Sequence, residues 1–316
     1  DLIYGGDVDK WIRLGNSLRL RLAMRVSYVS QDLASTNINE VLNDELIEDN
    51  SQNAILLAGG ADEPASQNKN PYYNGIPGGA KEFRFASFTV AETLTEMNDP
   101  REPKFIDLST AGDYFGIALN LSQDEKNVDI NRPANSSSAL SDLLWRPDFR
   151  FTLINASEVA FLRAEAALRG FTSEDAQSLY TTGIGLSMDY FGIDATAKSN
   201  YLASAAAVLT GTEEEKDEQI IVQKWIGNYP EFDEGYAEFR RTGYPRIWTG
   251  TAPNETNGEI PRRAQYPLSE YNSNSANVVA AAGRLSNGDS YLSKVGWDAK
   301  AGLPKHHPKQ GTCPPF

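Results

Sequence analysis

Two helical segments in residues 157–191 constrain the fold of this chain most. The first carries two apolar stripes at helical spacing, one of Val159, Leu162 and Ala166 and another of Phe161, Ala164 and Leu168. A helix that is apolar on two faces must be covered on both sides. We therefore expect this helix to lie inside the molecule, between layers of other helices.

The ends of these two segments predict a helical hairpin. Asn155 and Glu158 have the spacing of an N-cap and its reciprocal acid, and Gly170 is placed to end the first helix. Thr172 and Asp175 form a second candidate capping pair. Small residues would let the two helices approach closely, as in a tetratricopeptide-like pair; they are Ala164, Ala166, Ala167 and Gly183.

Apolar periodicity and turn residues place the remaining elements. Further helices are expected over residues 7–30, 37–49, 88–97, 139–145, 198–208, 212–229, 232–242 and 277–282, and short strands over residues 53–57, 104–108, 114–119 and 151–154. The predicted fold is mainly α, with tetratricopeptide-like helix pairs and a loop-rich half that carries a few short strands. We expect residues 1–316 to form one domain, with a loose tail from Lys305 onward.

Charge and rare residues exclude several classes of function. The formal net charge of −14 disfavours nucleic acid and anionic membranes as partners. His306 and His307 are adjacent, which leaves no histidine for a distant serine or a zinc site. The single cysteine, Cys313, excludes an internal disulfide framework. We expect no cofactor; a structural calcium ion near residues 124–129 stays open, although the spacing does not match a calcium-binding loop.

Two groups of arginines predict ion pairs. Arg13, Arg21 and Arg25 lie near one another on the first helix and should be paired with carboxylates from elsewhere in the chain. A second group consists of Arg240, Arg241, Arg262 and Arg263. This group could bind an anionic sugar, but we expect it to join the C-terminal half together through carboxylate pairs.

A long loop over residues 59–80 is the first candidate for ligand binding. It is rich in glycine, proline and asparagine and carries Tyr72 and Tyr73 next to Asn74. Tyrosine rings can stack on sugars, and amides can bond their hydroxyls. The alternative is that these rings fix the loop to the core. Trp145 and Trp248 are further aromatic candidates, whereas Trp11 and Trp225 are expected in the core.

Five segments together resemble the SusD/RagB family of nutrient-binding outer-membrane lipoproteins, in particular its SusD-like subgroup. They are KWIRLGNSLRLRLAMRVS (10–27), NDPREP (98–103), SEVAFLRAEAALRG (157–170), EFRRTGYPRI (238–247) and IPRRAQYPLSE (260–270). The resemblance spans nearly the whole chain in the right order. The family's usual ending is weakened to GWD at residues 296–298, and the tail that follows is unfamiliar.

The resemblance implies a function as well as a fold. Such proteins are lids of TonB-dependent transporters at the cell surface, where they capture glycans or other nutrients without catalysis. It also implies a lipid anchor through an N-terminal cysteine absent from this chain, and a chain that lacks the family's N-terminal helices. The ligand would be an oligosaccharide or another small nutrient.

Two other functions stay open from the residues alone. A glycoside hydrolase needs a pair of facing carboxylates, and Asp99, Asp107, Asp113 and Asp148 are candidates among 43 acidic residues. A tetratricopeptide-like scaffold would instead hold a protein partner on its concave face. A small-molecule cleft distinguishes the binding protein from the scaffold.

Overall fold

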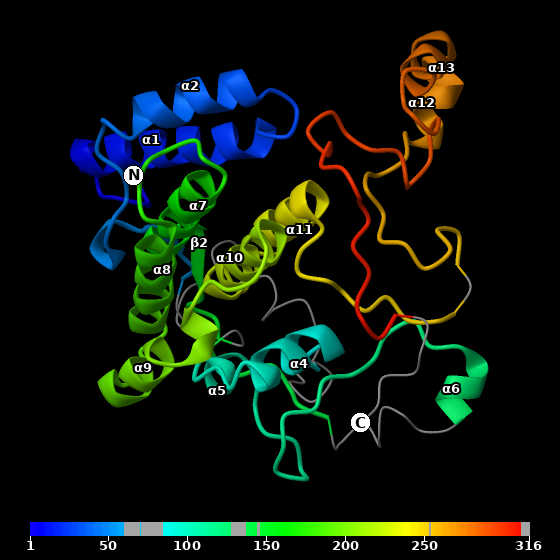
Figure 1. Cartoon of the computed structure of the whole chain (residues 1–316). Coiled ribbons are helices and arrows are strands. Elements are labelled where there is room, and N and C mark those ends of the chain that lie inside the picture. The colour runs from blue at the N-terminus through cyan, green and yellow to red at the C-terminus, as the bar shows by residue number, and fades with distance from the viewer. Residues whose placement is uncertain (60–69, 71–84, 128–136, 144–145, 253, 311–316) are drawn as a thin grey trace.

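The computed structural model describes residues 1–59, 70, 85–127, 137–143, 146–252 and 254–310. The predicted mainly α fold is confirmed (Figure 1). The elements, in chain order, are α1 (Val8–Val26), α2 (Gln31–Val41), the 3-10 helix η1 (Asn50–Gln52), β1 (Ala54–Leu57), α4 (Phe88–Glu96), α5 (Glu102–Phe105), α6 (Gln123–Asn127), β2 (Arg150–Ile154), α7 (Ala156–Leu168), α8 (Ala176–Tyr190), α9 (Ala195–Leu202), η5 (Ala205–Ala207), α10 (Glu213–Gly227), α11 (Phe232–Thr242), α12 (Leu268–Ser273) and α13 (Ser275–Ala282).

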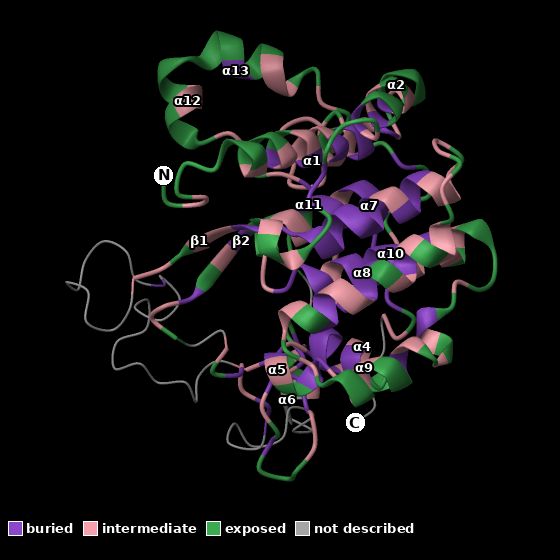
Figure 2. Ribbon diagram, turned by 90° about the vertical axis from the view of Figure 1, so that its left-hand side faces the viewer, coloured by how far each residue is buried: buried purple, intermediate pink, exposed green. Residues whose placement is uncertain are grey.

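The predicted helical hairpin is present as α7 and α8. The two helices pack along each other, α10 packs on both, and α1 contacts α7 from another side. Figure 2 shows α7 almost wholly buried within these layers. A Cβ on Gly183 would lie 2.7 Å from the Phe161 ring, so a glycine is what permits this close approach.

The helix caps agree with the sequence in part. The Asn155 side chain accepts from the backbone N–H of Glu158 at 2.8 Å, but the Glu158 carboxylate pairs with Arg21 rather than returning to the cap. Asp175 alone caps α8, so the predicted role of Thr172 is wrong. Thr212 and Glu215 form the expected capping box at the start of α10.

The strand predictions are right only where two segments pair along their length. β1 and β2 form an antiparallel pair. The strands predicted over residues 104–108 and 114–119 are wrong, because these segments form isolated bridges and α5 occupies residues 102–105. The helix predicted over residues 139–145 is also wrong in its described part, where Ala139 and Leu140 make bridges to other loops. Each of these segments pairs with its neighbour through one residue only. A run of apolar residues looks the same in the sequence whether it forms such a bridge or a full strand.

Carboxylates elsewhere in the chain pair with the arginines of α1, as expected; those of Arg21 and Arg25 lie on two helices, α7 and α11, and that of Arg13 is Glu45. Arg21 donates to both oxygens of Glu158 at 2.6 Å. Arg25 pairs with Glu234 and lies 3.5 Å from Glu238. These side chains are 2–16% exposed, so the pairs connect α1 to α7 and α11 inside the molecule.

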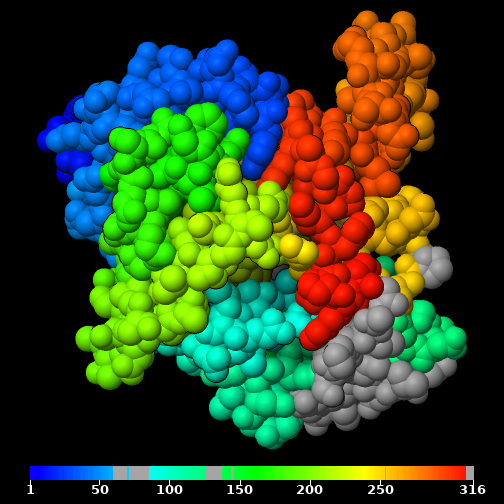
Figure 3. Space-filling view, in the orientation of Figure 1, coloured from blue at the N-terminus to red at the C-terminus, as the bar shows by residue number. Residues whose placement is uncertain are grey.

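The chain after α11 forms the loop-rich half. Gly243 ends α11 with a left-handed φ of 86°, and the following chain is mostly irregular apart from α12 and α13, which project from the surface (Figures 1 and 3). Arg262 pairs with Asp298 at 2.6 Å and Arg263 with Asp289 at 2.5 Å, as predicted. Arg240 differs: it stacks on Tyr236 and Trp297.

The tail is packed rather than loose through Gln310. Lys300 pairs with Asp217 of α10 at 2.9 Å, and His307 bonds Glu92 of α4 at 2.7 Å. Cys313 lies outside the described residues. Two further predictions are wrong: α2 ends at Val41, with Leu46 and Ile47 buried in extended chain, and Trp11 is 41% exposed rather than in the core. Trp225 is half-buried against the core, as expected.

Candidate functional site

A cleft in the loop-rich half contains Trp248, one of the predicted ligand-binding residues. Its volume is about 500 Å³. Segments distant in sequence line it: residues 119–120, residues 247–249 with 254–256 and 258–261, and Tyr291. We call it the Trp248 cleft.

The tail of the chain supports Trp248 from behind. The indole Nε1 donates to the carbonyl of Lys309 at 3.2 Å, and the ring packs edge-on against Phe88 of α4. Gln310 accepts from the Thr249 N–H at 3.1 Å and donates to the Gly250 carbonyl at 2.9 Å. Trp248 itself is only 5% exposed, so a small part of its ring faces the cleft.

Asn120 holds the opposite wall in place. Its carbonyl accepts from the N–H groups of Thr251 and Ala252 at 3.2 and 3.0 Å, and its side-chain amide donates to the Thr249 carbonyl at 3.1 Å. Gly250 has a φ of 82°, and a Cβ there would lie 2.3 Å from the Asn120 carbonyl oxygen. The two segments therefore meet at backbone distance, which only glycine allows.

The rim of the Trp248 cleft is a turn organised by Asn254. The side-chain Oδ1 of Asn254 accepts from the backbone N–H groups of Thr256 and Gly258 at 3.0 and 2.8 Å. This turn displays Glu255, which is exposed, next to the cleft. Tyr291 also lines the cleft. Its backbone carbonyl accepts a hydrogen bond from the backbone N–H of Arg262 at 2.7 Å.

The chemistry of the Trp248 cleft suits an uncharged ligand rich in hydroxyls. Its lining combines aromatic rings with amide, hydroxyl and carboxylate groups, and the described part of the chain contributes Glu255 and Glu259 to it but no lysine or arginine. Two carboxylates disfavour an anion by repulsion. Rings and planar polar groups are the usual contacts for the apolar faces and hydroxyls of sugars.

The other predicted site residues cannot be placed in this cleft. Tyr72, Tyr73, Asn74 and Trp145 lie outside the described residues. Asn70 is described and fully buried, and its side-chain amide donates to the Arg146 carbonyl at 3.1 Å. Sequence reasoning missed Tyr291 and Asn254, because isolated polar and aromatic residues in irregular chain carry no periodic signal.

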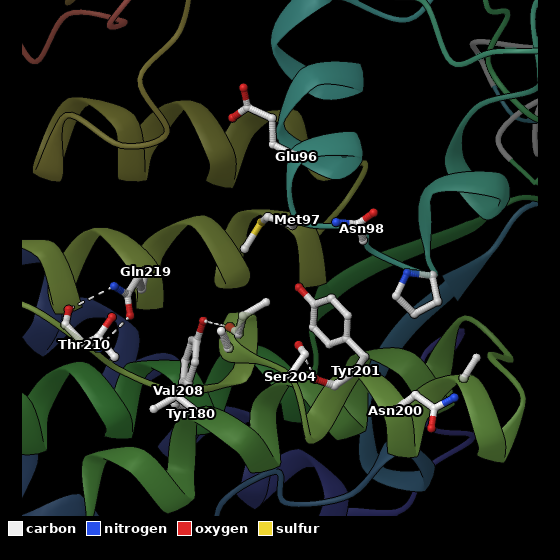
Figure 4. A pocket seen from close by; sticks show the side chains of 14 residues that line it. Glu96, Met97, Asn98, Tyr180, Asn200, Tyr201, Ser204, Val208, Thr210 and Gln219 are labelled. Atoms are coloured by element: carbon white, nitrogen blue, oxygen red, sulfur yellow. Dashed lines mark hydrogen bonds between the residues drawn. The ribbon is translucent and has the colours of Figure 1, made fainter.

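A second and larger hollow lies in the helical half. Its volume is about 760 Å³, and α4, α9, η5 and α10 contribute its lining. Figure 4 shows Tyr201, Asn200 and Ser204 on one side and Met97 and Asn98 on the other. We call it the α9 pocket.

The acidic residues considered for catalysis have structural partners. Asp99 is buried in a two-point pair with Arg101, Asp113 accepts from Ser109, and Asp148 accepts from Arg146. Asp107 also has an interaction partner. Within the described ranges, no group of three or more His, Cys, Asp or Glu side chains could hold a metal ion, and no helix is long and apolar enough to cross a bilayer.

Comparison with known proteins decides the family. Residues 1–267 match the model of the SusD-like family, described as "Starch-binding associating with outer membrane". The chain belongs to the SusD-like family. A comparison with functionally curated proteins finds no match.

Solved SusD-like structures share the fold over nearly the whole chain. A SusD homolog from Bacteroides uniformis is 28% identical, with a TM-score of 0.78 over 95% of this chain and 67% of that chain. A SusD-like protein from Bacteroides thetaiotaomicron is 30% identical, with a TM-score of 0.75 over 95% of this chain and 66% of that one. A chitin-binding SusD homolog from Flavobacterium johnsoniae is 26% identical, with a TM-score of 0.77 over 95% and 66%. The chain thus spans about two thirds of their length.

Membership of the SusD-like family places this protein among non-catalytic, glycan-binding proteins associated with the outer membrane. This agrees with the glycan binding, outer-membrane association and lack of catalysis that the sequence resemblance implies. The hydrolase alternative is thereby set aside.

Proposed function

We propose that this SusD-like protein binds an uncharged oligosaccharide, of the starch or chitin type, in the Trp248 cleft. One observation carries the proposal: a cleft in the loop-rich half joins Trp248 and Tyr291 to amide and carboxylate groups, and none of the described residues in its lining is basic. The description of the family as starch-binding and the chitin-binding relative support this ligand class.

Tyr72, Tyr73, Asn74 and Trp145 complete the proposed glycan contacts. Exposed rings would supply the stacking surface that the largely buried Trp248 offers only at its edge. Their support is their residue type and their position in a loop rich in glycine and proline.

We further propose that the protein acts at the cell surface as the lid of a TonB-dependent transporter, to which it delivers the glycan. The support is the resemblance of the five segments and the association of the family with the outer membrane. The packed helices α7, α8 and α10 give the rigid frame that a lid requires.

Two double variants test the glycan site. Tyr291→Ala with Glu255→Ala removes groups from the Trp248 cleft, and Tyr72→Ala with Tyr73→Ala removes the loop rings. A glycan array identifies the ligand, and titration calorimetry then measures each variant. We expect at least a tenfold weaker affinity, about 1.4 kcal/mol, for each. Unchanged affinity in a folded Tyr291→Ala, Glu255→Ala protein would move the site away from this cleft.

The transporter proposal has a separate test. The protein and a SusC-like transporter from the same organism are produced together and purified through a tag on the transporter. Retention of the SusD-like chain in a stoichiometric complex is expected. A transporter that purifies alone under conditions where both are folded contradicts the lid function.

A further inference from the structure

A buried chain of hydrogen bonds ends at the hydroxyl of Tyr201 in the α9 pocket. Asp99 accepts from Arg101 Nε at 2.9 Å and from Nη2 at 2.5 Å, and Arg101 Nη2 also donates to Gln223 Oε1 at 2.6 Å. A guanidinium group has only donors, so the Gln223 oxygen must face it and the Gln223 Nε2 must face Tyr201. This Nε2 donates to the Tyr201 oxygen at 3.0 Å.

The hydrogen of the Tyr201 hydroxyl is therefore left to point into the α9 pocket. Tyr201 is 5% exposed, its ring lines the α9 pocket, and its hydroxyl projects toward Met97 and Asn98 (Figure 4). No side chain or carbonyl of the described residues accepts this hydrogen. A buried donor without an acceptor is unfavourable, so the site favours a ligand or solvent oxygen at this point.

Two amides accompany this hydroxyl at the mouth of the pocket. Asn98 and Asn200 both line it, both are exposed, and neither side-chain amide has a hydrogen-bond partner among the described residues. Asn98 follows the C-terminus of α4 with a left-handed φ of 49°, while Asn200 belongs to α9. The pocket thus presents one directed donor and two free amides from separate elements.

The remaining lining limits the class of ligand. Met97, Pro100 and Val208 provide an apolar surface, and among the described residues Glu96 is the only charged one in the lining. A carboxylate without a basic group beside it in this described lining disfavours anions. Burial raises the pKa of Tyr201 and of Tyr180, so both phenols stay neutral at physiological pH. The volume of about 760 Å³ lies within the range of about 300–1,000 Å³ that is usual for small-ligand sites.

We propose that the α9 pocket is a second binding site, which takes a short uncharged oligosaccharide through the Tyr201 hydroxyl and the amides of Asn98 and Asn200. Sugar hydroxyls accept from Tyr201 and exchange hydrogen bonds with both amides, and an apolar sugar face lies on Met97 and Val208. The ligand class rests on the glycan binding of the family. The location of this second site is independent of the proposal for the Trp248 cleft, because the two sites share no lining residue.

The test counts ligands per chain by titration calorimetry, with malto-oligosaccharides and N-acetylchito-oligosaccharides as probes. The wild-type chain is expected to bind two ligands. Ala205→Trp places a ring in the pocket from an exposed position and should remove one of the two. Asn200→Ala should weaken that site by about threefold to tenfold, the value of one hydrogen bond. Tyr201→Phe should weaken the same site while its ring remains.

The matched control is Ser199→Ala, which changes an exposed polar residue of α9 that does not line the pocket. It should bind two ligands, as the wild type does. If Ala205→Trp changes neither the number of ligands bound per chain nor their affinity for any of the probes, the proposal is wrong. If Tyr291→Ala with Glu255→Ala leaves binding intact while Ala205→Trp reduces it, the α9 pocket is the glycan site and the Trp248 cleft is not.

Discussion

Arg241 on α11 donates two hydrogen bonds of 2.6 Å to Glu165 on α7, across 76 residues of sequence. Both side chains are fully buried. Arg241 also pairs with Glu238, which in turn accepts from Lys224 of α10. Helices α7, α10 and α11 are thus joined through a charged cluster whose side chains are at most 6% exposed.

Arg241→Ala should lower the free energy of unfolding by about 3–5 kcal/mol, because it leaves the carboxylates of Glu165 and Glu238 buried with less compensation. Urea denaturation measures the change. Arg19→Ala is the control, since Arg19 pairs with Glu40 at the surface, where both side chains are at least 39% exposed. That change should cost less than about 1 kcal/mol. Equal losses in the two variants would contradict a special role for the buried cluster.

Gly183→Ala should destabilise the protein, whereas Gly15→Ala should stabilise it. Alanine favours a helix over glycine by about 1 kcal/mol. At Gly15 in α1 the added Cβ meets nothing within 4 Å, so this gain is retained. At Gly183 it would lie 2.7 Å from the buried Phe161 ring, and overpacking of this kind costs about 1–3 kcal/mol. Thermal unfolding of both variants should shift in opposite directions; a rise for Gly183→Ala would refute the close packing.

Glu231 should make stability depend on pH between its unfolded and folded pKa values. Burial, reinforced by the charge of Glu158, raises the pKa of Glu231 from 4.5 to about 7, against a hydrogen bond from the Thr152 N–H. The folded state therefore binds more protons in this window, and the contribution of Glu231 to stability falls as pH rises from about 4.5 to about 7. Glu231→Gln removes the titration but keeps an acceptor for Thr152.

The measurement is the urea midpoint of both proteins across this pH range. The stability of the variant relative to the wild type should increase from about pH 4.5 and become constant above about pH 7. Parallel curves would show that folding does not raise the pKa of Glu231.

Gln310→Ala should weaken glycan binding in the Trp248 cleft without unfolding the protein. The change removes the bonds from Gln310 to Thr249 and Gly250, which position the chain after Trp248. We expect a severalfold lower affinity at this cleft, measured by calorimetry, with the thermal midpoint little altered. Gln265→Ala is a control, because Gln265 is an exposed glutamine whose side chain bonds the Asp289 carbonyl away from the cleft. An unchanged affinity for Gln310→Ala would show that the tail does not shape the site.

The helices were predictable where the helical spacing of apolar residues and the capping residues indicate the same boundaries. The α7–α8 hairpin, the Thr212–Glu215 capping box and the end of α11 at Gly243 follow from local rules. The arginines of α1 were correctly expected to be paired, because like charges at helical spacing need partners. Their partners, Glu158 and Glu234, come from distant helices that no local rule identifies.

The irregular half was less predictable for a physical reason. Its chain is held by single contacts between distant residues, such as Gln310 with Gly250 and His307 with Glu92. The tail looked loose because its sequence is polar and rich in proline, yet these contacts fix it behind Trp248. Tyr291 enters the cleft for the same reason, through neighbours that are remote in sequence.

The sequence by itself determined the helical class, the central hairpin, the acidic character that disfavours anionic partners, and a resemblance that the family match confirms. These follow from periodicity, capping and charge, which act over a few residues or over the whole chain. Only the tertiary structure decided that Trp248 is mostly buried, that Gln310 supports it, and that Gln223 orients the Tyr201 hydroxyl into a pocket. Those relationships depend on packing between residues far apart in the chain, where hydrogen-bond geometry and burial are set by the fold as a whole.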